Sequence, residues 1–94
     1  MLHVVVCYDV TSDSRRARLF DGLRSHLEHV QFSVFEGMVS PRDYAAVIRH
    51  IDSTINPDED DVRVYRLCPR CRNEVDLYGQ AGHVQAEAED VIVG

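Results

Sequence analysis

Apolar residues follow several kinds of spacing along the chain, and each kind predicts a secondary-structure element. The first is a continuous apolar run with several β-branched side chains over residues 2–10, in which Asp9 is the one acidic residue. Such a run predicts a strand that is buried on both faces and lies centrally in its sheet. Asp9 would then lie at the carboxyl end of a central strand.

A helix is predicted from about residue 13 to residue 28. Residues 11–14 are all suitable N-cap residues, because their short polar side chains accept hydrogen bonds from backbone N–H groups. The apolar positions that follow at helical spacing are Phe20, Leu23, Leu27 and Val30. Arg15, Arg18 and Arg24 occupy more exposed positions of this helix.

The next segment alternates at the period of a strand. Val30, Phe32 and Val34 would form an apolar strand face, and the opposite face would carry two polar residues and Phe35. We expect that second face to meet a partner. Gly37 allows a bend or bulge, after which a short strand continues.

The clearest helix of the chain begins near Ser40. Ser40 at the N-cap, Pro41 at N1 and Asp43 at N3 fit a helix start. The apolar stripe of this helix consists of Tyr44, Val47, Ile48, Ile51 and Ile55. A proline at position 57 ends the helix, and residues 61–68 alternate as another strand.

The predicted order of elements is strand, helix, strand pair, helix, strand. This is the order of the ferredoxin-like split βαβ arrangement, an α+β fold in which two helices cover one face of an antiparallel sheet. The 94 residues make one domain, and dimerisation would cover the other sheet face of so small a protein. We expect this domain to span residues 1–83. In the C-terminal tail, residues 84–94, the apolar triplet at 91–93 predicts an edge strand, in this sheet or in that of a partner subunit.

Charge is distributed unevenly along the chain. The net charge of −6 argues against a uniformly basic nucleic-acid-binding face, yet four of the ten arginines lie between positions 15 and 24. Residues 2–7 are too short for a signal-peptide core or a membrane span, so we expect a cytoplasmic location and no membrane association. Three cysteines, an odd number, favour free thiols or a metal clip over a disulfide framework.

Asp9 is the main candidate for chemistry. An aspartate at a strand end often only caps the next helix, but Tyr8 beside it and Arg15, Arg16 and Arg18 after it favour metal-assisted chemistry on a phosphate polymer. Its carboxylate suits Mg²⁺ or Mn²⁺, which bind oxygen ligands and substrate phosphate together. If the uncovered sheet faces of two chains meet about a twofold axis, the two Asp9 carboxylates would repel each other. A proton or a divalent cation would then have to lie between them.

Arg16, Arg18 and Phe35 each allow two interpretations. The arginines are either solvated helix residues or phosphate contacts. Phe35 is either a packing residue or a base-stacking platform, and packing at the dimer interface is the favoured interpretation.

Cys68 and Cys71 have the C-x-x-C spacing of a zinc half-site or a redox pair. No second such motif exists, and a four-ligand site would need Cys7, His83 or a partner chain. Structural or adventitious thiols are therefore the favoured interpretation of this possible thiol pair.

Other catalytic patterns are not indicated. We expect three histidines, His26, His29 and His50, to be surface residues, and none of them has a convincing nucleophile beside it. The sequence therefore does not indicate a serine hydrolase or cysteine protease triad. It also has no glycine-rich phosphate-binding loop.

Taken in order, these segments resemble the Cas-two family of CRISPR-associated proteins, small nuclease-like partners of the CRISPR integrase in spacer acquisition. The resemblance covers residues 2 to about 68. It rests on the strand ending in Tyr8-Asp9, on Arg16 and Arg18, on the block from Gln31 to Glu36 and on the strand from Val64 to Cys68.

The resemblance implies a ferredoxin-like homodimer with both Asp9 carboxylates at the interface. It implies Mg²⁺-dependent cleavage of RNA or DNA in some members, and a non-catalytic scaffold role between integrase dimers in others. By the same resemblance, Asp9 is the catalytic residue and metal ligand, Arg16 and Arg18 contact nucleic acid, and Tyr8 and Phe35 are supporting positions.

We therefore expect a subunit of the CRISPR adaptation machinery that binds nucleic acid as a homodimer in a complex with the integrase. The expected nucleic acid is duplex DNA, with single-stranded RNA as the other candidate, and the expected activity is an Mg²⁺- or Mn²⁺-dependent endonuclease. The alternatives are a non-catalytic scaffold, a toxin-like endoribonuclease and a small-molecule-sensing regulatory dimer.

Overall fold

Four strands and two helices form the described part of the chain. The computed structural model describes residues 1–68 and residue 76. The elements are β1 (Leu2–Asp9), α1 (Asp13–Leu23), β2 (Glu28–Gln31), β3 (Val34–Val39), α2 (Pro41–Thr54) and β4 (Asp61–Leu67).

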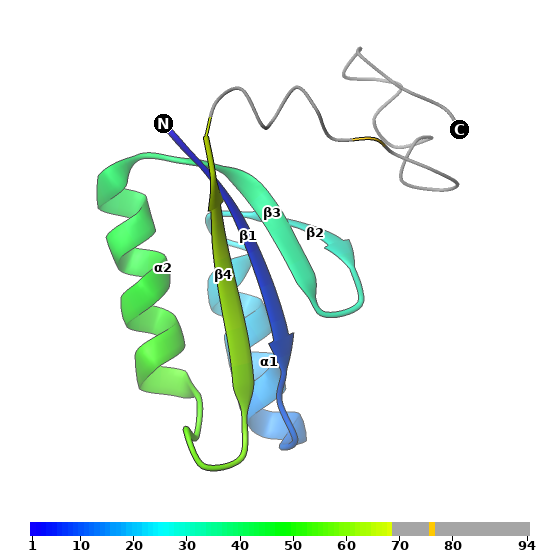
Figure 1. Ribbon diagram of the computed structural model, residues 1–94. Helices are drawn as coiled ribbons and strands as arrows, with labels where there is room; N and C mark the ends of the chain where they lie inside the picture. Colours follow the sequence, from blue (N-terminus) through cyan, green and yellow to red (C-terminus); the bar gives the residue numbers. More distant parts are fainter. Residues whose placement is uncertain (69–75, 77–94) are drawn as a thin grey trace.

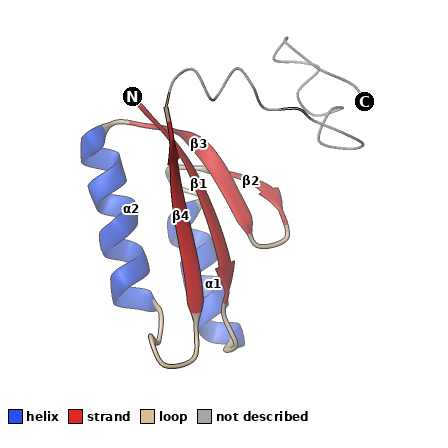
Figure 2. Ribbon diagram, viewed as in Figure 1, coloured by secondary structure: helices blue, strands red, loops and turns tan. Residues whose placement is uncertain are grey.

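The strands form one antiparallel sheet in the order β2-β3-β1-β4. β1 lies between β3 and β4, so the prediction of a central first strand is confirmed. Figures 1 and 2 show both helices against one side of the sheet, which is the predicted split βαβ arrangement of an α+β protein. The other side is called the open face below.

The core lies between the helices and the sheet. β1 contributes Val4, Val6 and Tyr8, which point to the same side because alternate residues of a strand share a face. The helices and the neighbouring strand complete it with Leu19, Leu23, Phe35, Val39, Val47 and Ile51. Because the alternate positions of β1 point to the open face, Asp9 lies on that face.

The two helix starts follow the N-cap pattern of the sequence. The Ser12 hydroxyl accepts a hydrogen bond from the Arg15 backbone N–H at 3.3 Å, and the Ser40 hydroxyl accepts one from the Asp43 N–H at 3.1 Å. Pro41 stands in the first turn of α2, as predicted. Each of these caps is local, so a few neighbouring residues suffice to specify it.

The first helix is shorter than the predicted range of 13 to 28. α1 ends at Leu23, and beyond it two backbone N–H groups bond to carbonyls only three residues back, from Ser25 to Gly22 and from His26 to Leu23. Leu27 is nevertheless buried, with 5% of its surface exposed. Leu27 fills the core from the turn before β2, so the prediction that it belongs to the helix is wrong.

The alternation predicted for residues 30–35 is wrong. Phe32 and Ser33 form a two-residue turn between Gln31 and Val34, which are paired across β2 and β3. The turn reverses the phase of the alternation, so Phe35 is fully buried in the core and Phe32 is 96% exposed. Phe35 is a packing residue, as favoured, but it packs within this chain and not at a partner-facing surface.

The helices approach each other closely at Gly22. A Cβ atom built there would collide with the imidazole ring of His50, whose Nε2 lies 3.0 Å from the Arg18 carbonyl oxygen on α1. His50 is half-buried, and its ring lies against α1. Glycine at position 22 therefore allows this side chain to join the two helices.

Several predictions fall on residues that lie outside the described part of the chain. These are the domain boundary at residue 83, the edge strand in residues 84–94, and Cys71. Within the described residues, no helix is long and apolar enough to cross a membrane.

Candidate functional site

Asp9 is the last residue of β1, and its side chain is exposed on the open face. Its direct partner across the β1–β4 pair is Asp61, the first residue of β4. Residues paired in this way point to the same face, with Cβ atoms about 4.5–5.5 Å apart. The structure therefore places two carboxylates side by side where two strands meet the loops.

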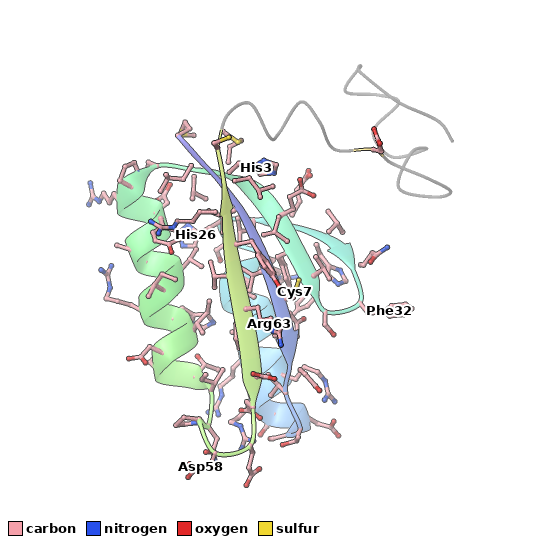
Figure 3. All side chains as sticks on the ribbon, viewed as in Figure 1. His3, Cys7, His26, Phe32, Asp58 and Arg63 are labelled. Carbon is pink, nitrogen blue, oxygen red and sulfur yellow. The ribbon has the colours of Figure 1, made fainter. Side chains whose placement is uncertain are left out.

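The open face behind these carboxylates is largely apolar. The register places Val5 beside Tyr65 and Cys7 beside Arg63, and both pairs lie on this face (Figure 3 labels Cys7 and Arg63). A hydrogen bond with Tyr65 and the negative charge of Asp61 raise the pKa of Arg63. This guanidinium therefore stays charged next to the carboxylate pair.

A polar pair interrupts the open face at the other end of β1. His3 is only 3% exposed, and its Nε2 lies 2.7 Å from a carboxylate oxygen of Glu36 on β3. The Nδ1 atom of His3 is buried and has no hydrogen-bond partner among the described residues.

Arg16 is in the first turn of α1, and its side chain reaches back to the end of β1. Its Nη1 donates a 2.7 Å hydrogen bond to the Val10 carbonyl, and its Nη2 pairs with Asp13. The side chain keeps 43% of its surface exposed, so its remaining donors can reach a ligand. Burial raises the pKa of the Tyr8 phenol, and the nearby Arg16 charge partly offsets that rise. Tyr8 is therefore a neutral donor at neutral pH.

Arg15 is committed to a different partner. Its Nε donates to Asp60 at 2.8 Å and its Nη2 contacts both Asp60 and Glu59. The Asp60 carboxylate is fully buried and also accepts the backbone N–H groups of Thr11 and Asn56. The bond from Arg15 is the largest of the effects that hold the pKa of Asp60 far below its usual range. This cluster ties the β1–α1 junction to the loop before β4.

The arginines do not form one cluster. Arg18 is exposed and lies two residues after Arg16, so the two side chains leave α1 on different sides. The Arg18 backbone carbonyl faces α2, where it meets His50. Of the predicted nucleic-acid contacts, the structure places Arg16 at the strand end near Asp9 and Arg18 elsewhere on the helix.

The supporting positions Tyr8 and Phe35 lie on the core side of the sheet, opposite the face that carries Asp9. Their rings stack with centroids 6.2 Å apart. They can hold the end of β1 in place but do not extend onto the open face. Cys68 is exposed just beyond β4, and its predicted partner in the C-x-x-C motif is Cys71, outside the described residues.

The donor set at the strand end suits a hard cation. Asp9 and Asp61 offer carboxylate oxygens only, which are the ligands that Mg²⁺ and Mn²⁺ prefer. Residues 1–68 contain no group of three His, Cys, Asp or Glu side chains placed to hold a metal. One chain thus supplies only part of the ligand set of such an ion, and water, phosphate or a second chain would have to complete it.

Known proteins resemble this chain over most of its length. The family model described as CRISPR associated protein Cas2, the Cas-two family, matches residues 1–75. The chain belongs to the Cas2 family. An Archaeoglobus fulgidus relative named CRISPR-associated endoribonuclease Cas2 1 is 35% identical over 83 residues, 87% of each chain. A Thermus thermophilus relative named CRISPR-associated endoribonuclease Cas2 is 32% identical over 97% of each chain.

Solved structures of the Cas2 family share the fold. Streptococcus pyogenes Cas2 at pH 6.5 superimposes with a TM-score of 0.71 and 26% identity, over 82% of this chain and 99% of that one. A chain of a structure titled partial Cas6-RT-Cas1–Cas2 complex gives a TM-score of 0.61 and 32% identity, over 73% of this chain and 81% of that one.

Two features of this Cas2-family chain were missed from the sequence. Asp61 was predicted as the first residue of the last strand, but its pairing with Asp9 depends on a strand register that alternation alone does not specify. The Arg15–Asp60 bond joins residues 45 positions apart, and the acidic run 58–61 gave no sign of which member is buried. Asp60 is an exception to the general rule that acidic side chains are exposed, and only the folded structure shows this.

Proposed function

We propose that this chain is a subunit of the CRISPR adaptation machinery that works as a homodimer with a CRISPR integrase and binds nucleic acid at the end of β1. We further propose an Mg²⁺- or Mn²⁺-dependent endonuclease activity centred on Asp9. The observation that carries the proposal is the exposed Asp9–Asp61 carboxylate pair with Arg16 anchored at the same strand end. The endoribonuclease names of the Cas2 relatives and the Cas1–Cas2 complex support it.

Each residue at this strand end has a distinct task in the proposed reaction. Asp9, with Asp61, would hold the cation, which supplies Lewis-acid polarisation of the phosphate and an activated water. Arg16 would contact the nucleic-acid backbone, because a guanidinium forms charge-assisted hydrogen bonds with phosphate oxygens. The bond from Arg16 to the Val10 carbonyl keeps that guanidinium in place before substrate arrives.

Dimerisation through the open face would bring two such strand ends together. Val5, Val34, Met38, Tyr65 and Leu67 belong to this face by register. Tyr65 is 46% exposed, and an apolar sheet face of this kind gains stability when it is covered. A second copy would also add its own Asp9–Asp61 carboxylate pair to the pair that the first chain provides.

The test of the dimer places a charge on the open face. Val5→Glu should convert the protein to a monomer in light scattering coupled to size exclusion. Ala45→Glu, on the exposed surface of α2, is the matched control and should leave the mass unchanged. A dimer that persists in Val5→Glu, with the fold intact by circular dichroism, would contradict this interface.

The catalytic proposal is tested with Asp9→Ala and with Asp52→Ala, an exposed acid on α2, as its control. Labelled RNA and DNA are incubated with Mg²⁺ or Mn²⁺, and spacer integration is measured with the same variants. If Asp9→Ala loses hydrolysis while wild type and Asp52→Ala retain it, the result supports a nuclease centred on Asp9. Metal-dependent hydrolysis that is equal in Asp9→Ala and wild type would exclude Asp9 as its centre.

A non-catalytic scaffold is the second candidate. The observation that favours it is the similarity to a chain of the structure titled partial Cas6-RT-Cas1–Cas2 complex. In that case the wild-type protein would show no hydrolysis, and Asp9→Ala would support integration as well as wild type does.

A further inference from the structure

Phe32 is an aromatic side chain without a place in the core. It lies at the tip of the β2–β3 turn with 96% of its surface exposed, and it projects away from the sheet in Figure 3. Ring contacts join Phe20, His29 and Phe35 to one another, and Phe32 takes no part in the ring contacts of the described residues. An exposed Phe of this kind contributes nothing to the stability of the fold.

The turn that carries Phe32 is nevertheless held firmly. The His29 Nε2 lies 2.9 Å from the Phe32 carbonyl oxygen, and the Tyr8 backbone N–H donates to the Ser33 carbonyl at 3.0 Å. These bonds fix the turn to its own hairpin and to the end of β1. Phe32 is therefore held near the strand end that carries Asp9, and little ordering is needed when it binds a ligand.

A shallow, open hollow lies between Phe32 and the outer side of α1. Its volume is about 390 Å³, and its lining includes Tyr8, Arg16, Ala17, Phe20 and Phe32. The hollow thus combines an exposed aromatic ring, an apolar floor and one guanidinium.

The charges around this hollow balance, although the whole chain is acidic. Asp13 and Asp21 also line it, and each has an arginine partner: Arg16 on α1 for Asp13, and Arg24 for Asp21 at 3.7 Å, just after α1 and outside the lining. The charged lining residues, two acids and one arginine, sum to −1, and Arg24 beside Asp21 brings the local sum to zero. A neutral planar group can therefore enter without electrostatic cost, and Arg16 stands at the edge for a phosphate attached to it.

We propose that this hollow receives one unpaired nucleobase, which stacks on Phe32 while Arg16 contacts the adjacent phosphate. The inference rests on the proposed nucleic-acid-binding function and deepens it. Aromatic stacking accepts every base but needs one that is free of a duplex, so the site would select single-stranded or frayed nucleic acid at the same end of β1 as Asp9, on the helix side of the sheet. A protein partner would instead have to offer a pocket for the Phe32 ring.

The experiment measures fluorescence anisotropy of a short single strand and of the matching blunt duplex. It compares wild type, Phe32→Ala, Phe32→Tyr and Val30→Ala, an exposed apolar control on the same hairpin. Phe32→Ala should weaken single-strand binding about 5- to 140-fold, the change to which 1–3 kcal/mol of base stacking converts at 1.4 kcal/mol per tenfold. Duplex affinity should hold within about twofold. Phe32→Tyr and Val30→Ala should bind both as wild type does. A 2-aminopurine base in the strand should be quenched by wild type and not by Phe32→Ala.

Three outcomes would overturn the inference. If wild type and Phe32→Ala bind the single strand equally, the stacking site is wrong while the proposed nucleic-acid binding stands. If wild type binds neither strand nor duplex, the proposed function fails and the inference fails with it. If Phe32→Ala keeps its oligonucleotide affinity but no longer co-purifies with the integrase subunit, Phe32 is an anchor for a protein.

Discussion

Asp9 and Asp61 face each other across β1 and β4, so the strand end of this Cas2-family chain carries two neighbouring negative charges on its open face. Like charges in directly opposed strand positions destabilise a sheet. Their placement therefore costs stability in the isolated protein, and a cation bound between them would remove the cost.

The first prediction follows from this repulsion. Asp9→Asn should raise the free energy of unfolding by about 0.2–1 kcal/mol, toward the lower end because both side chains are exposed. Asp61→Asn should raise it less, because it also removes the attraction between Asp61 and Arg63. The double variant should gain little more than either single one, since one substitution already removes the repulsion. Urea unfolding at fixed protein concentration measures the effect, with Asp52→Asn on α2 as the control. Mg²⁺ should stabilise wild type and leave Asp9→Asn unchanged; equal stabilisation of both would place the ion elsewhere.

The second prediction concerns the acid sensitivity of the Arg15–Asp60 contact. The pKa of Asp60 is lowered in the folded state, chiefly by the hydrogen bond from Arg15. Its contribution to stability is therefore complete above the unfolded pKa of about 3.9 and is lost as the pH falls from there toward the folded value. Asp60→Asn should melt at a lower temperature at pH 7, and its melting temperature should fall less steeply below about pH 5. The exposed neighbour Asp58 provides the control, and Asp58→Asn should follow wild type. If the melting temperatures of wild type and Asp60→Asn fall equally steeply as the pH is lowered, this carboxylate is not the source of the acid sensitivity.

The third prediction uses the contact between Gly22 and His50. Gly22→Ala should destabilise the protein by about 1–3 kcal/mol, because the new methyl group displaces the imidazole from the Arg18 carbonyl. In a His50→Ala background the same substitution should stabilise it by up to about 1 kcal/mol, the helix-propensity gain of alanine over glycine. A double-mutant cycle measured by denaturant unfolding gives the coupling. The same sign of effect in both backgrounds would mean that His50 does not constrain position 22.

The fourth prediction compares two phenylalanines three residues apart. Phe35 is fully buried and its ring lies 5.2 Å from that of Phe20, so Phe35→Ala should cost about 3–5 kcal/mol. Phe32→Ala removes an exposed ring and should change stability by no more than about 0.5 kcal/mol. Thermal or urea unfolding distinguishes the two. A large loss in Phe32→Ala would show that the turn packs against something in solution, such as a second subunit.

Local signals predicted much of the fold. The N-cap serines, the proline in the first turn of α2 and the strand over residues 61–67 are specified by hydrogen bonds and side-chain spacing within a few residues. The central position of β1 followed from its apolar character. The end of α1 was not predictable in the same way, because Leu27 continues the helical spacing although the chain has already turned toward β2.

The turn at Phe32-Ser33 shows why alternation alone was insufficient. Six residues with alternating character fit one strand as well as two, and no glycine or asparagine marks the turn. The choice was made by tertiary packing, since turning there places Phe35 against Phe20 and Tyr8 in the core. The same choice left Phe32 exposed beside Arg16.

By itself, the sequence determined the order of the elements, the α+β architecture, the position of Asp9 at a strand end and the resemblance to the family to which the chain belongs. Those features depend on periodicity and on residue types close together in the chain. Only the tertiary structure decided that Asp61 stands opposite Asp9, that Arg15 is bound to Asp60 and that the arginines of α1 point in different directions. Strand register and buried ion pairs join residues far apart in the chain, and their partners are chosen by the packing of the whole domain.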